Sequence, residues 1–246
     1  MNGNSSNYDF VEGIAKQVLN LFFIIDSSGS MSGERIGAVN NAIRDVMDIM
    51  PEIQEETADV EIKISALKFS DKASWIYPEA KSVEEFKWKD INADGVTNLT
   101  DAYQELEKQL TKESNGGMMP DFGGYAPIMI LMTDGLPTSP DWPTALESLK
   151  KRGWFRVALR YALAIDIDSD EARDVLIAFT GNSETLLKVH SAESLRKVIK
   201  LIAVTASKVK SQSSTTLNNQ AGAQNQAATK QINDSLADID DVDGWN

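Results

Sequence analysis

Apolar residues recur along the chain with two spacings, one typical of buried strands and the other of helices. Continuous apolar runs, rich in β-branched and aromatic residues, are typical of strands that are covered on both faces. They predict strands over residues 18–25, 60–69, 126–132, 155–165 and 184–190, with a short edge strand over 75–77. Apolar positions three and four residues apart predict helices over 35–50, 99–110 and 144–151, a helix from Asp168 to Phe179 and a long helix after Ser191. Pro51 is expected to end the first helix, and Asp168 and Ser191 to cap the last two.

The order of these elements predicts the fold class. Strands and helices alternate, which favours a three-layer α/β fold: a mostly parallel, doubly wound (Rossmann-like) sheet with helices on both faces. Residues 17–210 are expected to form this single domain after a lead-in of residues 1–16. From Ser211 on, small polar residues and Asp dominate, so residues 211–246 are expected to be a flexible polar and acidic tail. In sheets of this kind ligands bind at the carboxyl ends of the strands.

Composition excludes several classes of protein. The 246 residues include no cysteine, which excludes disulfides, thiolate metal sites and a cysteine nucleophile. The formal net charge of −13, without a basic cluster, argues against nucleic acid as a partner. The polar first ten residues lack the order of a secretion signal, and the longest apolar run near them is too short to cross a bilayer. We therefore expect a cytoplasmic protein without a membrane span.

Three polar segments fall where this fold places ligands. Asp26, Ser28 and Ser30 directly follow the first predicted strand, Thr97 opens a helix, and Asp134 follows the strand over 126–132. Mg²⁺ prefers about six oxygen ligands near 2.1 Å and often keeps water, so hydroxyls with two carboxylates suit it. Each segment alone is an ordinary turn or helix cap. Together, at one sheet edge, they predict a metal site of Asp26, Ser28, Ser30, Thr97 and Asp134 with one position open for a carboxylate.

The same residues resemble the metal-ion-dependent adhesion site of von Willebrand factor A domains, over roughly residues 19–210. Within that superfamily, residues 21–31, 37–43 and 125–138, with Trp142 following, resemble bacterial TerY-type proteins of tellurium-resistance and stress clusters. The resemblance implies direct ligation by Ser28, Ser30 and Thr97, with Asp26 and Asp134 acting through water. Val96 departs from the family pattern, in which two glycines commonly precede the threonine, and it is expected to stiffen that loop.

Three functions are compatible with these residues. The favoured one is a protein-binding module, not an enzyme, that captures a partner's Asp or Glu through Mg²⁺, with Mn²⁺ as a close alternative. The resemblance implies a stress-response setting with a kinase or phosphatase of the same gene cluster as partner. The second is a metal-dependent phosphohydrolase with Asp26 as phosphate acceptor, although Ser28 stands where such enzymes need a second aspartate. The third is a scaffold in which the metal only stabilises the fold.

Other features leave two interpretations each. His190 is expected to be structural rather than catalytic, and Asp166, Asp168 and Asp170 to cap a helix rather than bind calcium. The stretch 116–124, with its glycines and methionines, is expected to be a mobile loop near the site, either merely filling space or contacting a partner. The acidic tail is either simply solvated or a tethered inhibitor that reaches the open metal position.

Overall fold

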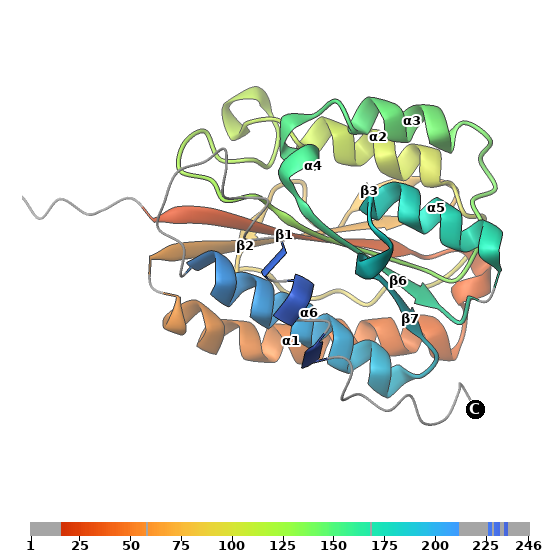
Figure 1. The fold of residues 1–246 in the computed structure, drawn as a ribbon, viewed down its shortest axis with the longest axis horizontal. Helices are drawn as coiled ribbons and strands as arrows, with labels where there is room; N and C mark the ends of the chain where they lie inside the picture. The colour runs from red at the N-terminus through yellow and green to blue at the C-terminus, as the bar shows by residue number, and fades with distance from the viewer. Residues whose placement is uncertain are drawn as a thin grey trace, which may run out of the picture.

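A seven-stranded sheet forms the centre of the structure, a computed structural model that describes residues 16–57, 59–167, 169–211, 226–227, 229–231 and 234–235 (Figure 1). The strands are β1 (Gln17–Asp26), β2 (Val60–Phe69), β3 (Ala73–Trp75), β4 (Lys81–Ser82), β5 (Ile128–Thr133), β6 (Leu159–Ile165) and β7 (Leu186–Val189). Their order is β3-β2-β1-β5-β6-β7, with β4 also paired to β2. The pairs among β2, β1, β5, β6 and β7 are parallel, and only β3 and β4 run antiparallel to β2.

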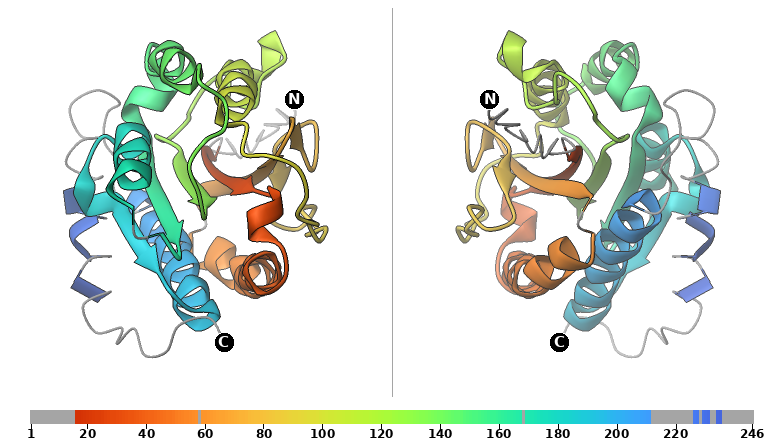
Figure 2. Two further views of the ribbon diagram at one scale, coloured as in Figure 1. Left: turned by 90° about the vertical axis from the view of Figure 1, so that its right-hand side faces the viewer. Right: turned by 90° about the vertical axis from the view of Figure 1, so that its left-hand side faces the viewer.

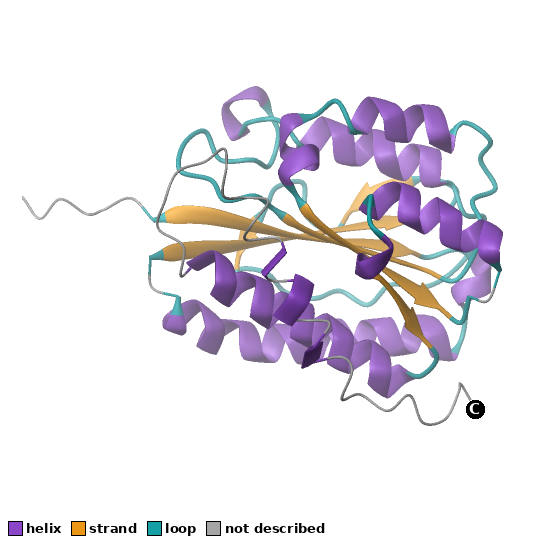
Figure 3. Cartoon of the chain, viewed as in Figure 1, coloured by secondary structure: helices purple, strands orange, loops and turns teal. Residues whose placement is uncertain are grey.

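Helices cover both faces of the sheet (Figures 2 and 3). One face packs against α1 (Glu34–Glu56) and α6 (Ala192–Ser211); the other packs against α2 (Leu99–Gln109), α3 (Trp142–Leu149), α4 (Gly153–Val157) and α5 (Asp170–Thr180). Three 3₁₀ turns are Gly29–Met31, Glu113–Asn115 and Ser183–Thr185. Side chains of β1 alternate between the two cores: Leu21 and Phe23 pack toward α1 and α6, and Phe22 and Ile24 toward α2 and α5. The three-layer, mostly parallel α/β fold is therefore confirmed.

The strand order reverses between β1 and β5, and this places the carboxyl ends of the two strands together. The chain adds β2 on one side of β1, and then adds β5, β6 and β7 in turn on the other side. Ile25 pairs with Met132, so Asp26 and Thr133 end their strands side by side. This is the position at which doubly wound sheets bind ligands.

Several predicted boundaries were wrong, among them the edge strand, which spans Ala73–Trp75 instead of 75–77. Helix α1 continues past Pro51 to Glu56, because the proline ring lies on the exposed side while Ile53 is buried in the core. Residues 153–157 form helix α4, and the strand begins only at Leu159. The final strand is shorter than 184–190, because residues 183–185 form a 3₁₀ turn. The cap of α5 is Ser169, whose hydroxyl accepts a hydrogen bond from the Ala172 amide at 3.1 Å; Asp168 lies outside the described residues.

Other predictions have different outcomes. The Ser191 cap is confirmed, since its hydroxyl accepts a hydrogen bond from the Ser194 amide at 3.1 Å. The loop over 116–124 was wrongly placed near the site: Met118 and Met119 are buried, and the Gly123 carbonyl accepts a hydrogen bond from Val18, at the opposite end of β1. Its methionines therefore do not offer a partner surface.

Most of the predicted tail, and with it most carboxylates of the tethered-inhibitor hypothesis, lies outside the described residues. In one described piece Thr229 is buried, and its hydroxyl accepts a hydrogen bond from Tyr161 at 3.5 Å. The domain boundaries at residues 17 and 210 and the flexibility of the tail stay predictions.

Candidate metal centre

Asp26 is a buried carboxylate that organises the first loop. It ends β1 and is fully buried. Its Oδ1 accepts a hydrogen bond from the Ser28 amide at 2.8 Å, and its Oδ2 accepts one from the Thr133 hydroxyl. Burial raises the pKa of Asp26 above its usual 3.8, against the hydrogen bonds from Thr133 and Ser28, which lower it. Both oxygens thus hold neighbouring groups in place, and a cation beside them would relieve the cost of the buried charge.

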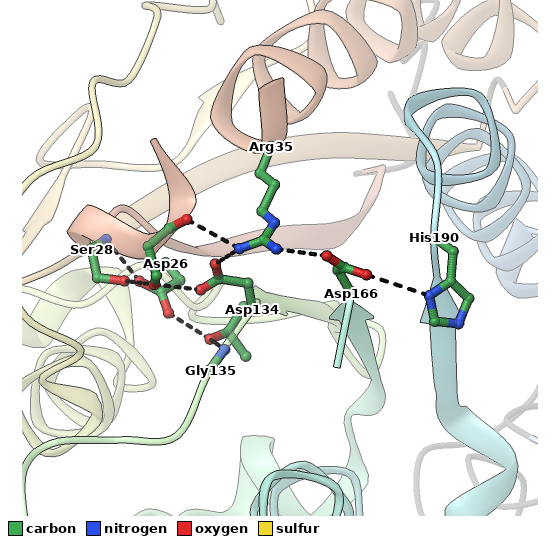
Figure 4. A network of polar contacts seen from close by, with 9 residues as sticks. Asp26, Ser28, Arg35, Asp134, Gly135, Asp166 and His190 are labelled. Carbon is green, nitrogen blue, oxygen red and sulfur yellow. Dashed lines mark hydrogen bonds and ion pairs between the residues drawn. The ribbon is translucent and has the colours of Figure 1, made fainter. Parts of the chain in front are cut away.

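The hydroxyls of Ser28 and Ser30 lie next to each other and next to Asp134. The Ser28 Oγ to Ser30 Oγ distance is 3.0 Å, and Ser30 Oγ donates to Asp134 Oδ1 at 2.7 Å (Figure 4). Two adjacent ligands of an octahedral ion at 2.1 Å are about 3.0 Å apart. The spacing of the two serine oxygens therefore suits a shared cation of this kind. A serine that donates its proton to Asp134 still presents a lone pair to such an ion.

Thr97 reaches the same edge through its backbone. Its side chain is largely buried, and its carbonyl accepts a hydrogen bond from the Thr138 amide at 2.9 Å, which joins it to the loop after β5. The Gly29 amide donates to the Gly95 carbonyl at 2.9 Å, which joins the same segment to the serine loop. Within the described residues, the Thr97 hydroxyl makes no hydrogen bond to the other four candidate ligands. The structure thus links Asp26, Ser28, Ser30 and Asp134 by side chains and Thr97 by loop contacts.

Arg35 is a member of this cluster that the sequence analysis missed. Its Nη1 donates to Asp134 Oδ2 at 2.7 Å and to the Ser30 carbonyl at 3.2 Å, and its Nη2 donates to Asp166 Oδ2 at 2.6 Å (Figure 4). Burial lowers the pKa of Arg35, but the hydrogen bonds to Asp166 and Asp134 outweigh it and raise the pKa overall. The sequence contains one indication of this role: Arg35 is the first basic residue after Lys16 and the nearest one in sequence to the loop of Ser28 and Ser30.

Asp166 belongs to the Arg35 network rather than to a calcium loop. It follows β6 with a positive φ of 56°, and its Oδ1 lies 3.9 Å from His190 Nδ1. Asp170 begins helix α5 and pairs with Arg173 at 3.7 Å. No group of three or more His, Asp or Glu side chains suited to a metal occurs among the described residues. The calcium interpretation therefore has no support there, and His190 lies at the margin of the network.

The donor set suits a hard cation. It combines hydroxyl oxygens with the carboxylates Asp26 and Asp134, and the chain contains neither cysteine nor a second histidine. Mg²⁺ and Mn²⁺ prefer such oxygens, whereas soft ions prefer sulfur. The residues present therefore fit a divalent ion with water completing its shell.

Comparison with known proteins identifies the family of this domain. The family model of the von Willebrand factor type A domain matches residues 20–201, which include all five candidate ligands. The chain belongs to the von Willebrand factor type A family. Domains of this family commonly bind proteins through a divalent metal at a metal-ion-dependent adhesion site.

Relatives of this von Willebrand factor type A chain include inter-alpha-trypsin inhibitor heavy chain H4. The human protein is 30% identical over 170 residues, or 66% of this chain, and the bovine protein is 29% identical over 140 residues, or 56% of this chain. The chain spans only 17% and 15% of the length of these two relatives.

Solved structures share the fold. The domain of the type V pili tip protein Mfa5 from Porphyromonas gingivalis has a TM-score of 0.58 at 10% identity, covering 83% of this chain and 99% of that one. Proximal thread matrix protein 1 from the mussel byssus, whose adhesion-site motif holds zinc, has a TM-score of 0.54 at 16% identity, covering 79% and 46%. At these identities the similarity concerns the fold. Among the described residues, no helix is both long and apolar enough to span a membrane.

Proposed function

We propose that this chain is a protein-binding module that captures a partner's Asp or Glu through a divalent cation. Ser28, Ser30 and Thr97 would hold the ion directly, and Asp26 and Asp134 would act through bound water. The observation that carries this proposal is the 3.0 Å spacing of the two serine oxygens, which suits adjacent positions around one octahedral ion. The hydrogen bonds that Asp26 and Asp134 already accept favour an orienting role for both carboxylates.

Mg²⁺ is the ion we propose, with Mn²⁺ as the close alternative. Hydroxyl and carboxylate oxygens favour both over softer ions. The structurally similar mussel protein holds zinc at its adhesion-site motif, so Zn²⁺ belongs in the comparison of ions. Competition among Mg²⁺, Mn²⁺ and Zn²⁺ for the purified chain would rank them directly.

The TerY-like stretches support a more specific setting. Residues 21–31 and 125–138 contain the ends of β1 and β5 with four of the five candidate ligands, whereas residues 37–43 lie within α1. We propose a cytoplasmic role in a bacterial tellurium or stress response, with a kinase or phosphatase of the same cluster as the partner. Mg²⁺-dependent binding to the products of neighbouring genes would test this setting.

The phosphohydrolase interpretation gains no support from the geometry. Asp26 would have to attack phosphorus, yet it is fully buried and both of its oxygens accept hydrogen bonds.

Chelation of the ion distinguishes the scaffold interpretation from the binding module. A scaffold would lose stability when EDTA removes the ion, whereas a binding module would chiefly lose its partner.

Crystals soaked in Mn²⁺ test the proposal. We expect an anomalous peak within about 2.3 Å of Ser28 Oγ and Ser30 Oγ. The Ser28→Ala variant, treated identically, should lose that peak while its backbone is unchanged. A wild-type crystal without density between the serine loop and Asp134 would refute the metal site.

A further inference from the structure

Two exposed apolar side chains flank the candidate metal site. Three large hydrophobic residues are exposed in the described part of the chain: Phe122, Val96 and Leu136, with exposed fractions of 89%, 50% and 40%. Val96 directly precedes Thr97, and Leu136 is the second residue after Asp134. Apolar side chains that are exposed beside a polar binding position are removed from water when a partner covers them, which favours binding.

The backbone holds these two side chains at the same edge. The Thr138 amide and hydroxyl both donate to the Thr97 carbonyl, at 2.9 and 3.2 Å, so the segments that carry Val96 and Leu136 lie side by side. The Val96 amide donates to Asp71 Oδ1 at 2.9 Å. A Cβ added at Gly95, whose φ is +80°, would lie only 2.5 Å from the same oxygen. Val96 is therefore presented on a backbone that Asp71 fixes.

The charges nearby restrict what can bind. Asp71 contacts the Val96 amide, the Asp94 carboxylate accepts a hydrogen bond from Gly95, and Asp166 pairs with Arg35 on the far side of Asp134. A partner segment with several acidic residues would meet these carboxylates and be repelled. A single carboxylate between apolar residues meets the ion and the two apolar side chains without that repulsion.

We propose that Val96 and Leu136 select a partner segment in which one Asp or Glu is flanked by apolar residues. This inference rests on the proposed function, because it assigns a partner chemistry to the same site. The acidic residue binds at the ion, and its apolar neighbours cover Val96 and Leu136. Burying the exposed parts of two such side chains strengthens binding by roughly tenfold.

Short synthetic peptides test this preference on the full chain. Each peptide is acetylated, amidated and labelled, and carries one Asp flanked on both sides by Leu, by Ser or by Glu. In Mg²⁺, fluorescence anisotropy should show the Leu-flanked peptide binding about tenfold more tightly than the Ser-flanked one, and the Glu-flanked one most weakly. Equal affinities for the Leu and Ser peptides would overturn the inference.

Variants assign the preference to the two side chains. The double variant Val96→Thr, Leu136→Gln should bind the Leu and Ser peptides equally, with an unchanged affinity for Mn²⁺ measured by electron paramagnetic resonance. Phe122→Ser is the matched control, because it removes an even more exposed apolar side chain far from the site. Phe122 precedes Gly123, which accepts a hydrogen bond from Val18 at the start of β1, about 26 Å along the strand from Asp26. This variant should keep the preference for the Leu peptide. A double variant that keeps the preference would refute the role of these residues.

The two proposals fail in different ways. Mg²⁺-dependent binding without a preference for Leu would overturn this inference and leave the proposed function intact. Binding that persists in EDTA, or none at all while Mn²⁺ is bound, would overturn both.

Discussion

Arg35 covers Asp134. The guanidinium Nη1 lies 2.7 Å from Asp134 Oδ2, and the Asp134 side chain has no exposed surface, while 31% of the Arg35 side chain is exposed. A positive charge therefore already sits against one of the two carboxylates of the candidate metal site. Because like charges repel, Arg35 weakens the attraction of the site for a second cation. In the absence of metal, the same contact compensates the buried charge of Asp134.

The Arg35→Gln variant should consequently change metal affinity and stability in opposite ways. We expect Mn²⁺ to bind several-fold to about tenfold more tightly, because the competing charge is gone. In EDTA the free energy of unfolding should fall by about 1–3 kcal/mol, because Asp134 loses its ionic partner. Paramagnetic resonance titration and urea unfolding measure the two effects.

Arg44→Gln is the matched control for that variant. Arg44 lies on the same helix but pairs with Asp90 at the surface, where the two side chains are 47% and 58% exposed. Neither the Mn²⁺ affinity nor the stability should change by more than about 0.5 kcal/mol. If Arg35→Gln binds Mn²⁺ more weakly than wild type, Arg35 supports the metal site instead of competing with the ion.

The Ser28→Ala variant should lose metal affinity and keep its fold. The substitution removes one candidate ligand oxygen, so we expect at least about a tenfold weaker Mn²⁺ affinity. The backbone amide of Ser28, which donates to Asp26, is retained. Ser32→Ala removes a hydroxyl from the exposed end of the same loop, where it donates a hydrogen bond to the Ala93 carbonyl at 3.4 Å, and should bind Mn²⁺ normally. Equal affinities of the two variants would exclude Ser28 as a ligand.

Two glycines should respond to alanine with opposite signs. At Gly95, the φ of +80° and the 2.5 Å approach to Asp71 both oppose a side chain, so Gly95→Ala should destabilise by about 1–3 kcal/mol and weaken metal binding at Thr97. At Gly37, inside α1, an added Cβ meets nothing within 4 Å, so Gly37→Ala should stabilise by roughly 0.5–1 kcal/mol. Urea unfolding of both variants checks the pair; a stabilising Gly95→Ala would contradict it.

The hydrophobic pattern of the sequence was sufficient to predict the site residues that lie at strand ends. Asp26 and Asp134 each follow an apolar run of strand length, and parallel strands bring such ends together. Arg35 could not be predicted in the same way. Its two acidic partners are 99 and 131 residues away, and only the packing of α1 beside the ends of β5 and β6 brings them within hydrogen-bonding distance.

The wrong boundaries have a common physical cause. Tertiary packing overrode the local sequence preference. Ile53 is buried beyond Pro51, and the ring of Phe155, in helix α4, packs edge-on against the ring of Phe179 with 5.6 Å between the ring centroids. An apolar residue such as Phe155 fits a buried strand or a buried helix equally well by its spacing alone. The loop over 116–124 was misplaced because nothing in its composition reveals its pairing with the start of β1.

The raised pKa of Asp26 leads to a pH-dependent prediction. Because burial raises this pKa above the usual 3.8, the folded protein holds the proton more tightly than the unfolded chain. The stability from Asp26 is therefore complete below pH 3.8 and is lost as the pH rises through the folded-state pKa. Asp26→Asn cannot ionise, so in EDTA its stability relative to wild type should increase between pH 4 and pH 7.

Metal should reverse this difference. At pH 7, saturating Mg²⁺ should stabilise wild type more than Asp26→Asn, because only the aspartate gains a counter-charge for its buried carboxylate. Urea unfolding of both proteins at several pH values, with EDTA and with Mg²⁺, measures the two effects. If the difference in stability between the two proteins in EDTA stays constant from pH 4 to pH 7, the pKa of the Asp26 carboxyl is unshifted. The cation would then not act by relieving the cost of a buried charge at Asp26.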